Sequence, residues 1–409
     1  MTRFESVDRA LRRTTAVALI VGVVGIALAV VGWLLDPETF FRAWLFGFLT
    51  WWQIAIGSLG LAMLYHLAGG HWGTATRPIF DAASRTLPLL AVLFVPVALG
   101  LRSIYPWADQ AWISEHPLNE SRRVYFDEPF FIGRTVVYFA IWIVFAMLLS
   151  WRTVSPAGRL NTAEHQRLSK VAAGGMVLLV LTVTGAAVDW LMSLDPFFKS
   201  TMFGGIVVAA AGVAGMAFAA LLTATLPRQV TVVAEQPATV LNDLGNLLLA
   251  FVMVWTYLMF GQFLIIWMGN LPEEVVWYQE RQAGGWQTLI IVVVLFHFAL
   301  PVFLLLFRDM KQAPQRLMTV ALLVLLMRVA DNYWTVAPSW YGPKFGLHWL
   351  YLVTPIAIGG LWFAEFVRNL RPRLEPFRHE GTAVIEPPRH HHEGERPQAS
   401  DADARRSST

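Results

Sequence analysis

The chain has 409 residues, of which 56% are hydrophobic and 14% are charged, and its formal net charge is +3. Soluble domains carry about 25% charged residues, so this composition excludes an ordinary soluble protein. The absence of cysteine excludes disulfides, thiolate-held Fe–S clusters and thioether-linked haem in this chain. Because its apolar runs are continuous rather than alternating, we expect an all-α polytopic membrane protein and not a β-barrel.

The chain divides into three parts. Residues 1–13 form a short N-terminal segment with four arginines, and the apolar run behind it lacks a clear cleavage site, so we expect a retained first helix. Ten runs reach the roughly 20 residues that a spanning helix needs. These runs are 14–35, 41–66, 79–101, 130–151, 168–189, 201–225, 240–267, 285–307, 314–335 and 346–368. They make a transmembrane domain over 14–368.

The last part, residues 369–409, is rich in Arg, Glu, Pro, Ser and His and is predicted to be a disordered cytoplasmic tail. Its run His390–His392 is more simply a solvated polar stretch than a metal site. With the N-terminus in the cytoplasm, inner segments hold 21 Lys and Arg residues and outer segments hold 7. The positive-inside rule therefore predicts that both termini are cytoplasmic, and this bias explains the net charge without a nucleic-acid partner.

Two predicted helix ends resemble each other. Asp189, Ser193 and Pro196 follow one spacing, and Asp331, Thr335 and Pro338 repeat it four helices later. This repeat predicts two four-helix bundles, helices 2–5 and helices 6–9, flanked by helices 1 and 10. Chance similarity is the alternative, because Asp, Thr and Pro commonly end helices.

Ionisable side chains inside a bilayer are costly and often mark ion or proton paths. We expect an outer polar cluster of Arg134, Asp189, Arg328, Asp331 and His348. We expect an inner cluster of His66, Asp81, Arg85, Asp243, Asn246 and Glu365. Between these levels we expect few polar residues, namely Gln53, Thr182, Thr184, Thr256, Gln262 and His297.

Proton transfer needs groups that exchange a proton, so the candidate relays are Asp189, Asp243, Asp331, His66 and His297. Arg85, Arg134 and Arg328 would pair with the carboxylates. Groups close to an interface, such as His66 and His348, can instead extend to water. His297 can simply bond a neighbouring helix, and it lacks a second central histidine for a haem. No metal site is predicted.

Four segments together resemble the second large NrfD-like membrane subunit of bacterial alternative complex III, over most of helices 5 to 10. They are Asp189-Trp-Leu-Met-Ser-Leu-Asp-Pro-Phe-Phe, Asp243-Leu-Gly-Asn-Leu-Leu-Leu-Ala-Phe, Gln262-Phe-Leu-Ile-Ile-Trp-Met-Gly-Asn-Leu-Pro-Glu-Glu and Asp331-Asn-Tyr-Trp. The resemblance implies a ten-helix subunit of a quinol:electron-acceptor oxidoreductase in the bacterial inner membrane. The motif positions that it points to are Asp189, Asp243 and Asp331.

The same resemblance implies partners, namely an NrfD-like paralogue, an Fe–S protein and a multihaem cytochrome c. Haem and Fe–S centres would lie in those partners, while this chain would contribute proton half-channels and a quinone-facing site without catalysing the redox step alone. Two other classes remain open. A stand-alone secondary transporter would show broken helices at mid-membrane, yet most Pro and Gly breaks fall at helix ends. A structural scaffold would use its polar clusters only to join helices.

Overall fold

Ten helical segments of this protein are long and apolar enough to cross a membrane, which confirms the predicted all-α polytopic membrane fold. The computed structural model describes residues 3–150, 162–226 and 237–374, and within these ranges the chain contains no β-strand. The spans are Val7–Leu35, Pro37–Ala68, His71–Leu99, Glu128–Ser150, Glu164–Leu194, Phe203–Thr225, Ala238–Gly269, Trp286–Leu306, Pro314–Tyr341 and Leu350–Leu374.

Several spans consist of more than one helix. The first half of the described chain forms α1 (Arg3–Leu35), α2 (Pro37–Ala68), α3 (His71–Ser84), α4 (Leu87–Leu93), α5 (Val95–Leu99), α6 (Leu101–Ile104), η1 (Pro106–Ala108), α7 (Gln110–Glu115), α8 (Glu120–Tyr125), α9 (Glu128–Ser150) and α10 (Thr162–Trp190). The second half forms η2 (Met192–Leu194), α11 (Phe203–Thr225), α12 (Pro237–Gly269), α13 (Pro272–Arg281), α14 (Trp286–Val293), η5 (Val294–Ala299), α15 (Leu300–Leu306), α16 (Arg308–Gln312), α17 (Pro314–Val336), α18 (Pro338–Tyr341) and α19 (Leu350–Leu374).

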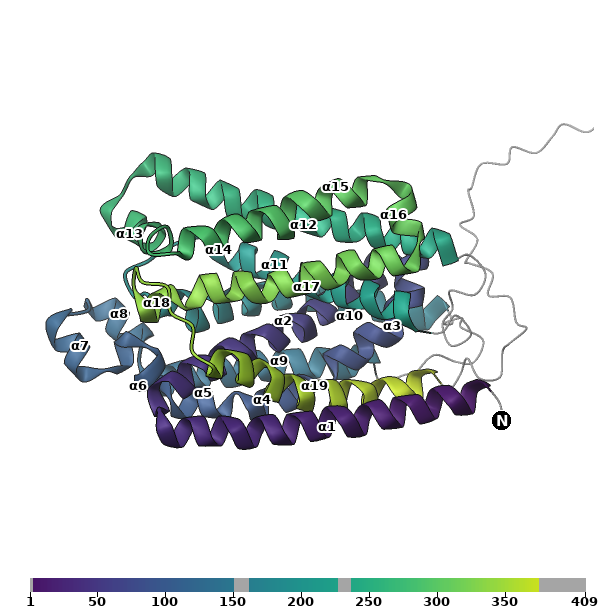
Figure 1. The fold of residues 1–409 in the computed structure, drawn as a ribbon, viewed down its shortest axis with the longest axis horizontal. Coiled ribbons are helices and arrows are strands. Elements are labelled where there is room, and N and C mark those ends of the chain that lie inside the picture. The colour runs from purple at the N-terminus through teal and green to yellow at the C-terminus, as the bar shows by residue number, and fades with distance from the viewer. Residues whose placement is uncertain (1–2, 151–161, 227–236, 375–409) are drawn as a thin grey trace, which may run out of the picture.

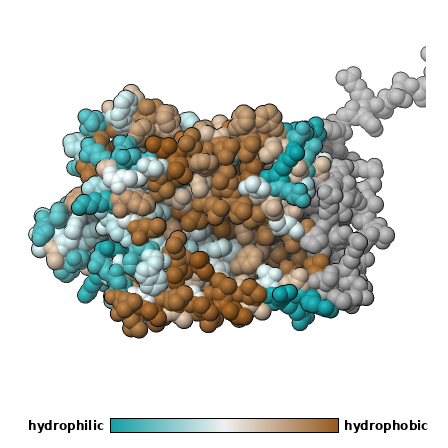
Figure 2. All heavy atoms as spheres, in the orientation of Figure 1, coloured by the Kyte–Doolittle hydropathy of each residue, from teal (hydrophilic) through white to brown (hydrophobic). Residues whose placement is uncertain are grey.

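The two ends of the bundle differ. The start of α1 and the end of α19 lie at one end, which we call the terminal face, and the opposite end, the loop face, carries α6–α8, α13 and α18 (Figure 1). A broad apolar belt separates two hydrophilic ends (Figure 2). Large apolar side chains are exposed along the belt, including Ile20, Val177, Tyr257, Ile291 and Leu352. Such a surface suits lipid and not water.

Two helix ends differ from the sequence-based boundaries. The ninth span does not stop at residue 335, because α18 continues the path of α17 from Pro338 to Tyr341. Proline fits the first turn of a helix, where no N–H donor is needed. The last helix, α19, runs to Leu374, past the predicted tail boundary at residue 368. The rest of the predicted tail lies outside the described residues.

The helices form the two predicted bundles. The first contains α2, the third span α3–α5, α9 and α10, and the second contains α11, α12, the eighth span and α17. Helices α1 and α19 pack along each other, and α19 also packs against α2. Between the bundles, α2 and α11 make the most extensive contact.

Glycine makes that contact close. A Cβ added at Gly57 of α2 would overlap the carbonyl oxygen of Ala211 on α11, and one added at Gly215 would come within 2.8 Å of the Gly57 carbonyl carbon. Small residues let membrane helices approach to backbone contact, and that contact contributes dispersion energy in place of a hydrophobic driving force. The two bundles are therefore joined at a glycine crossing.

We expect Gly57→Ala to lower the stability of the detergent-solubilised protein by about 1–3 kcal/mol, because the methyl group forces the bundles apart. The matched control is Gly174→Ala on α10, where the added Cβ meets no atom within 4 Å. Thermal unfolding followed by tryptophan fluorescence compares the two. Equal melting temperatures for both variants would contradict the glycine crossing.

Candidate functional site

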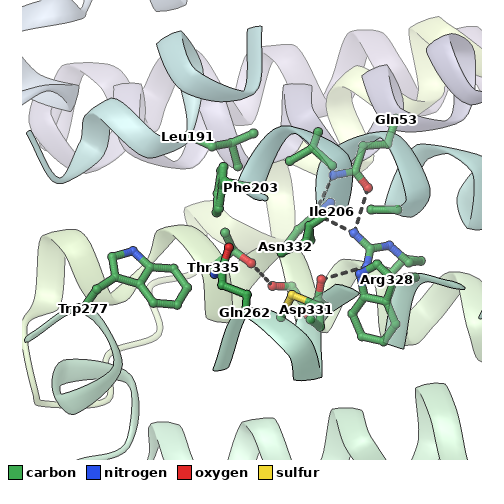
Figure 3. Close-up of a pocket in the computed structure, with 14 residues that line it drawn as sticks. Gln53, Leu191, Phe203, Ile206, Gln262, Trp277, Arg328, Asp331, Asn332 and Thr335 are labelled. Carbon is green, nitrogen blue, oxygen red and sulfur yellow. Dashed lines mark hydrogen bonds and ion pairs between the residues drawn. The ribbon is translucent and has the colours of Figure 1, made fainter. Parts of the chain in front are cut away.

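A charged pair lies at the centre of the protein. Arg328 of α17 donates from Nη1 to Asp331 Oδ2 at 2.7 Å and from Nη2 to Gln53 Oε1 at 3.0 Å. Gln53 Nε2 in turn donates to Asn332 Oδ1 at 2.8 Å. The side chains of the ion pair are both 5% exposed. We call Gln53, Arg328, Asp331 and Asn332 the central cluster (Figure 3).

The central cluster joins the two bundles, because Gln53 belongs to α2 and the other three residues to α17. It also lies at mid-membrane. Gln53 stands at the middle of the span Pro37–Ala68, and Arg328 at the middle of the span Pro314–Tyr341. Arg328 and Asp331, which were expected in the outer polar cluster, lie near the middle of the ninth span, because that span continues through α18 to Tyr341. The sequence predicts few polar residues at this middle level, but the structure has a full ion pair there.

A small cavity adjoins the central cluster. Its volume is about 20 Å³, and apolar side chains such as Trp255 and Phe203 line it together with the polar residues Gln53, Gln262, Arg328, Asp331, Asn332 and Thr335. A site for one water needs roughly 10–15 Å³ and two or more polar partners. Asp331 Oδ1 has no hydrogen-bond partner among the described residues. The cavity therefore suits about one water molecule beside a carboxylate oxygen.

His297 lies next to this cluster without lining the cavity. Its ring packs edge-on against Trp255 at a centroid distance of 4.5 Å, and the Arg328 guanidinium lies 5.4 Å from the same indole. The histidine is fully buried in the π-helical turn η5. Pro301, which follows this turn, cannot donate to the His297 carbonyl, so the helix widens there. Thus Trp255 contacts both His297 and the Arg328 guanidinium.

A second buried carboxylate is held more completely. Asp189 is inaccessible and accepts four hydrogen bonds: two from Arg134 at 2.9 Å, one from Tyr125 at 2.8 Å and one from Tyr138 at 2.9 Å. Such a fork from arginine fixes carboxylate orientation strongly. This group, Tyr125, Arg134, Tyr138 and Asp189, is the loop-face cluster and joins α8, α9 and α10. The single outer cluster expected from sequence is thus two separate clusters.

Polar side chains continue from the central cavity toward the loop face. Gln262 accepts from Ser200 at 2.7 Å and donates to Tyr278 at 3.1 Å. Burial raises the pKa of Tyr278 to about 12, so this phenol is neutral at physiological pH. Gln262 also lines the central cavity, together with Asp331. Hydrogen-bonding groups therefore extend from α13, at the loop face, to the mid-membrane carboxylate.

Arg281 fastens α13 to the ninth span. It donates to the carbonyl of Thr335 at 2.8 Å and to Ser339 Oγ at 2.9 Å, and its guanidinium lies over the Trp277 ring at 3.7 Å. Burial lowers its pKa to about 9. Its fixed hydrogen bonds make it a structural residue of the loop face.

A third group lies near the terminal face. Arg77 Nε lies 3.5 Å from Asp81 Oδ2, and both side chains are buried. Arg85 and Arg373 also interact electrostatically with Asp81, and His66 lies beside Arg77. We call His66, Arg77, Asp81, Arg85 and Arg373 the terminal-face cluster. It brings together three residues of the expected inner cluster.

Other predicted site residues lie elsewhere. Asp243 is half-buried near the start of α12, one turn before Asn246, which accepts from Lys311 at 2.6 Å. Glu365 accepts hydrogen bonds from Arg368 and Asn369 of its own helix. His348 accepts from the Leu350 amide and lies beside Asp36, so it does not join a buried cluster. Among the described residues no group of three His, Asp or Glu side chains has the arrangement of a metal site.

Sequence reasoning missed several members of these clusters. Tyr125 and Tyr138 were not singled out, because tyrosine is common near membrane interfaces. Asn332, adjacent to Asp331 in one quoted motif, carried a usable signal. Arg77 and Arg373 were counted only as positive-inside charges. Compared with known protein families and with characterised proteins, the chain shows no significant match.

Neutralising one member of the central pair should be far more costly than neutralising both. We expect Asp331→Asn or Arg328→Gln to destabilise by about 3–5 kcal/mol, since each leaves a buried charge unpaired, and the double variant to lose much less than the sum. The exposed pair Arg102–Glu128, at 3.4 Å, is the control and should contribute below about 1 kcal/mol. Thermal melts of all variants measure the coupling. If the two single substitutions at the central pair had additive effects on stability, this coupling would be contradicted.

Proposed function

We propose that this integral membrane protein is a subunit of a quinol-oxidising respiratory complex, in which it conducts protons between the loop face and the middle of the membrane. The observation that carries the proposal is the central cluster, where a carboxylate with one unpartnered oxygen lies beside a water-sized cavity. Ionisable residues at this depth are expensive and are usually functional. A carboxylate and a water are the groups that exchange protons.

The path is one-sided. On the loop-face side, Gln262 and Tyr278 continue the polar surface beyond the cavity. On the terminal side, the stretch of α2 between Gln53 and the terminal-face cluster is mainly apolar, with Leu59 and Met63 buried and Ser58 as a buried hydroxyl. A proton that reaches Asp331 from the loop face therefore crosses about half of the membrane field, which amounts to roughly 1 kcal/mol per 100 mV.

Asp331 suits proton exchange better than Asp189. All the polar groups around Asp189 are committed, with two bonds from Arg134 and one from each tyrosine. Protonating that carboxylate would break several charge-assisted bonds at once. We therefore assign proton transfer to Asp331, and we assign to Asp189 the structural role of joining α8, α9 and α10.

The central cavity favours protons over a quinone. Pockets for organic ligands usually measure roughly 300–1,000 Å³, whereas this cavity measures about 20 Å³. A quinone contact belongs instead on the outer surface of the chain or at a boundary with a partner subunit. The electron carriers, haem and Fe–S centres, belong to partner subunits in this proposal, with an NrfD-like paralogue, an Fe–S protein and a multihaem cytochrome c as the expected partners.

The resemblance to alternative complex III supports this assignment. Residues from three of its four segments line the one cavity, namely Leu191, Gln262, Asp331 and Asn332. Motifs far apart in sequence thus converge where the charged pair lies. In this proposal the membrane is the bacterial inner membrane and the terminal face is cytoplasmic, as the distribution of Lys and Arg indicates.

A stand-alone transporter is the second candidate, because η5 breaks the regular helix at mid-span beside Pro301. Broken helices mark substrate sites in many transporters. The small cavity gives such a substrate little room. Affinity purification of the tagged full chain from mild detergent separates the two: co-purifying haem and Fe–S subunits support the respiratory complex, and a colourless homogeneous particle supports the transporter.

The proton role is tested with the charge-neutral double variant Arg328→Gln/Asp331→Asn, which leaves no unpaired charge. We expect the assembled complex to lose quinol-driven proton release by about 10²-fold, the usual contribution of a positioned proton-transfer group. Asp331→Glu, which keeps a carboxylate, should retain most of the release. A pH dye in proteoliposomes reports the rate, and Glu128→Gln at the exposed loop face is the matched control.

Full proton release by the assembled double variant would overturn the assignment of Asp331. Assembly is checked on the same preparation by native gel, so a loss of release is not mistaken for a loss of the complex.

A further inference from the structure

The terminal-face cluster carries an uncompensated charge. Three guanidinium groups, those of Arg77, Arg85 and Arg373, interact with the single carboxylate of Asp81. The described surroundings of this group therefore hold a net charge of about +2. Arg77 and Arg373 are each 6% exposed, so water screens them poorly. Buried charges are costly unless paired and hydrogen-bonded.

The same group has unused hydrogen-bond donors. Among the described residues, Arg77 Nη2, Arg373 Nε and both ring nitrogens of His66 have no hydrogen-bond partner, and neither does the acceptor Asp81 Oδ1. Arg77 Nε makes only the 3.5 Å ion pair with Asp81. Buried polar atoms without partners are rare in native proteins and call for a missing partner. Several donors and a surplus of positive charge in one place require an anion with several acceptor oxygens.

A crevice opens beside the cluster. Its volume is about 270 Å³, and it is lined by Arg85 and Asn369 together with Pro88, Ile143, Ala146 and Met147. Arg85 belongs to both the cluster and the crevice, and it also donates to Ser150 Oγ at 2.7 Å. The crevice thus has an arginine at one side and apolar walls from α4 and α9. That combination suits an acyl chain attached to an anionic headgroup.

We infer that the terminal-face cluster binds the phosphate group of an anionic phospholipid whose acyl chain occupies the crevice lined by Ile143 and Met147. Guanidinium groups match phosphate oxygens by paired hydrogen bonds. Anionic lipids are enriched at the face that positive residues mark as cytoplasmic. A neutral quinone would leave the surplus charge uncompensated. Free inorganic phosphate shares the anion chemistry but makes no use of the apolar crevice.

This site is independent of the proton role assigned to Asp331. It also gives a different role to His66, predicted from the sequence as a proton relay, and to Arg85, predicted as a partner of carboxylates. In the proposed state a bound phosphate takes up the free donors of this cluster, so its side chains do not form an open proton entrance. The lipid instead neutralises the cluster and ties α3, α9 and α19 together.

The full chain, purified in neutral detergent and stripped of lipid, is titrated with phosphatidylglycerol, with phosphatidylcholine or with inorganic phosphate. Native mass spectrometry counts bound lipid, and thermal unfolding measures stabilisation. We expect phosphatidylglycerol to bind and to raise the melting temperature. Arg373→Gln should weaken this binding by about tenfold or more, since it removes one charge-assisted contact.

Arg368→Gln is the matched control, because Arg368 lies on the same helix near the terminal face but its side chain is 71% exposed and pairs with Glu365. Its lipid affinity should not change. A second test variant, Arg77→Gln/Asp81→Asn, removes one ion pair and the charged donors of Arg77, while the surplus charge of about +2 stays on Arg85 and Arg373, and it should also bind the lipid more weakly. Equal losses for Arg368→Gln and Arg373→Gln would overturn the site in favour of general surface attraction.

Two further outcomes also decide the matter. Stabilisation by inorganic phosphate equal to that by phosphatidylglycerol would overturn the lipid as the source of the anion. Equal binding of phosphatidylcholine would overturn the requirement for a net negative headgroup. Neither result depends on Asp331, so the proton role and the lipid site can fail separately.

Discussion

The architecture depends on neutralising one buried cation at mid-membrane. Arg328 lies where water is scarce, so its charge is tolerated only because Asp331 and Gln53 both bond it. Gln53 reaches it from the other bundle, and that contact requires the close glycine crossing at Gly57. Close packing of the bundles is thus what allows the charge of Arg328 to be hydrogen-bonded. A small displacement of α2 would leave the guanidinium short of an acceptor.

The three polar clusters differ in how completely they are satisfied. The carboxylate of Asp189 has four donors and is rigid. The central pair has one spare carboxylate oxygen and the spare donor Arg328 Nε, whereas the terminal-face cluster has several spare donors, the spare oxygen Asp81 Oδ1 and a surplus of positive charge. A fully bonded group stabilises, a group with one free acceptor can exchange a proton, and a group with free donors and surplus charge can bind an anion. Chemical role follows from the unsatisfied atoms rather than from residue type.

Hydropathy predicted the ten spans, because each run must satisfy its own backbone hydrogen bonds in lipid, and the repeated helix ends at Asp189 and Asp331 predicted the two bundles. The depth of each side chain in the membrane was harder to predict. The sequence predicts that the ninth helix ends before Pro338, yet the span continues through α18, and Arg328 therefore lies at the middle of the span. Hydrogen-bond partners were harder still to predict, since Gln53 and Arg328 come from helices far apart in sequence. Arg77 and Arg373 looked like ordinary interfacial charges, and only the fold shows that they converge.

The length of the longest helices has one more consequence. At 1.5 Å per residue, α2 is about 48 Å long, whereas the hydrocarbon core of a bilayer is about 30 Å thick. With the middle of α2 near the bilayer midplane, the excess extends into the headgroup layer on both sides. The groups around Asp189 and Asp81, although buried, then lie nearer the headgroup layers. Within the described spans, the Arg328–Asp331 pair lies nearest the bilayer midplane and bears the full cost of a charge in hydrocarbon.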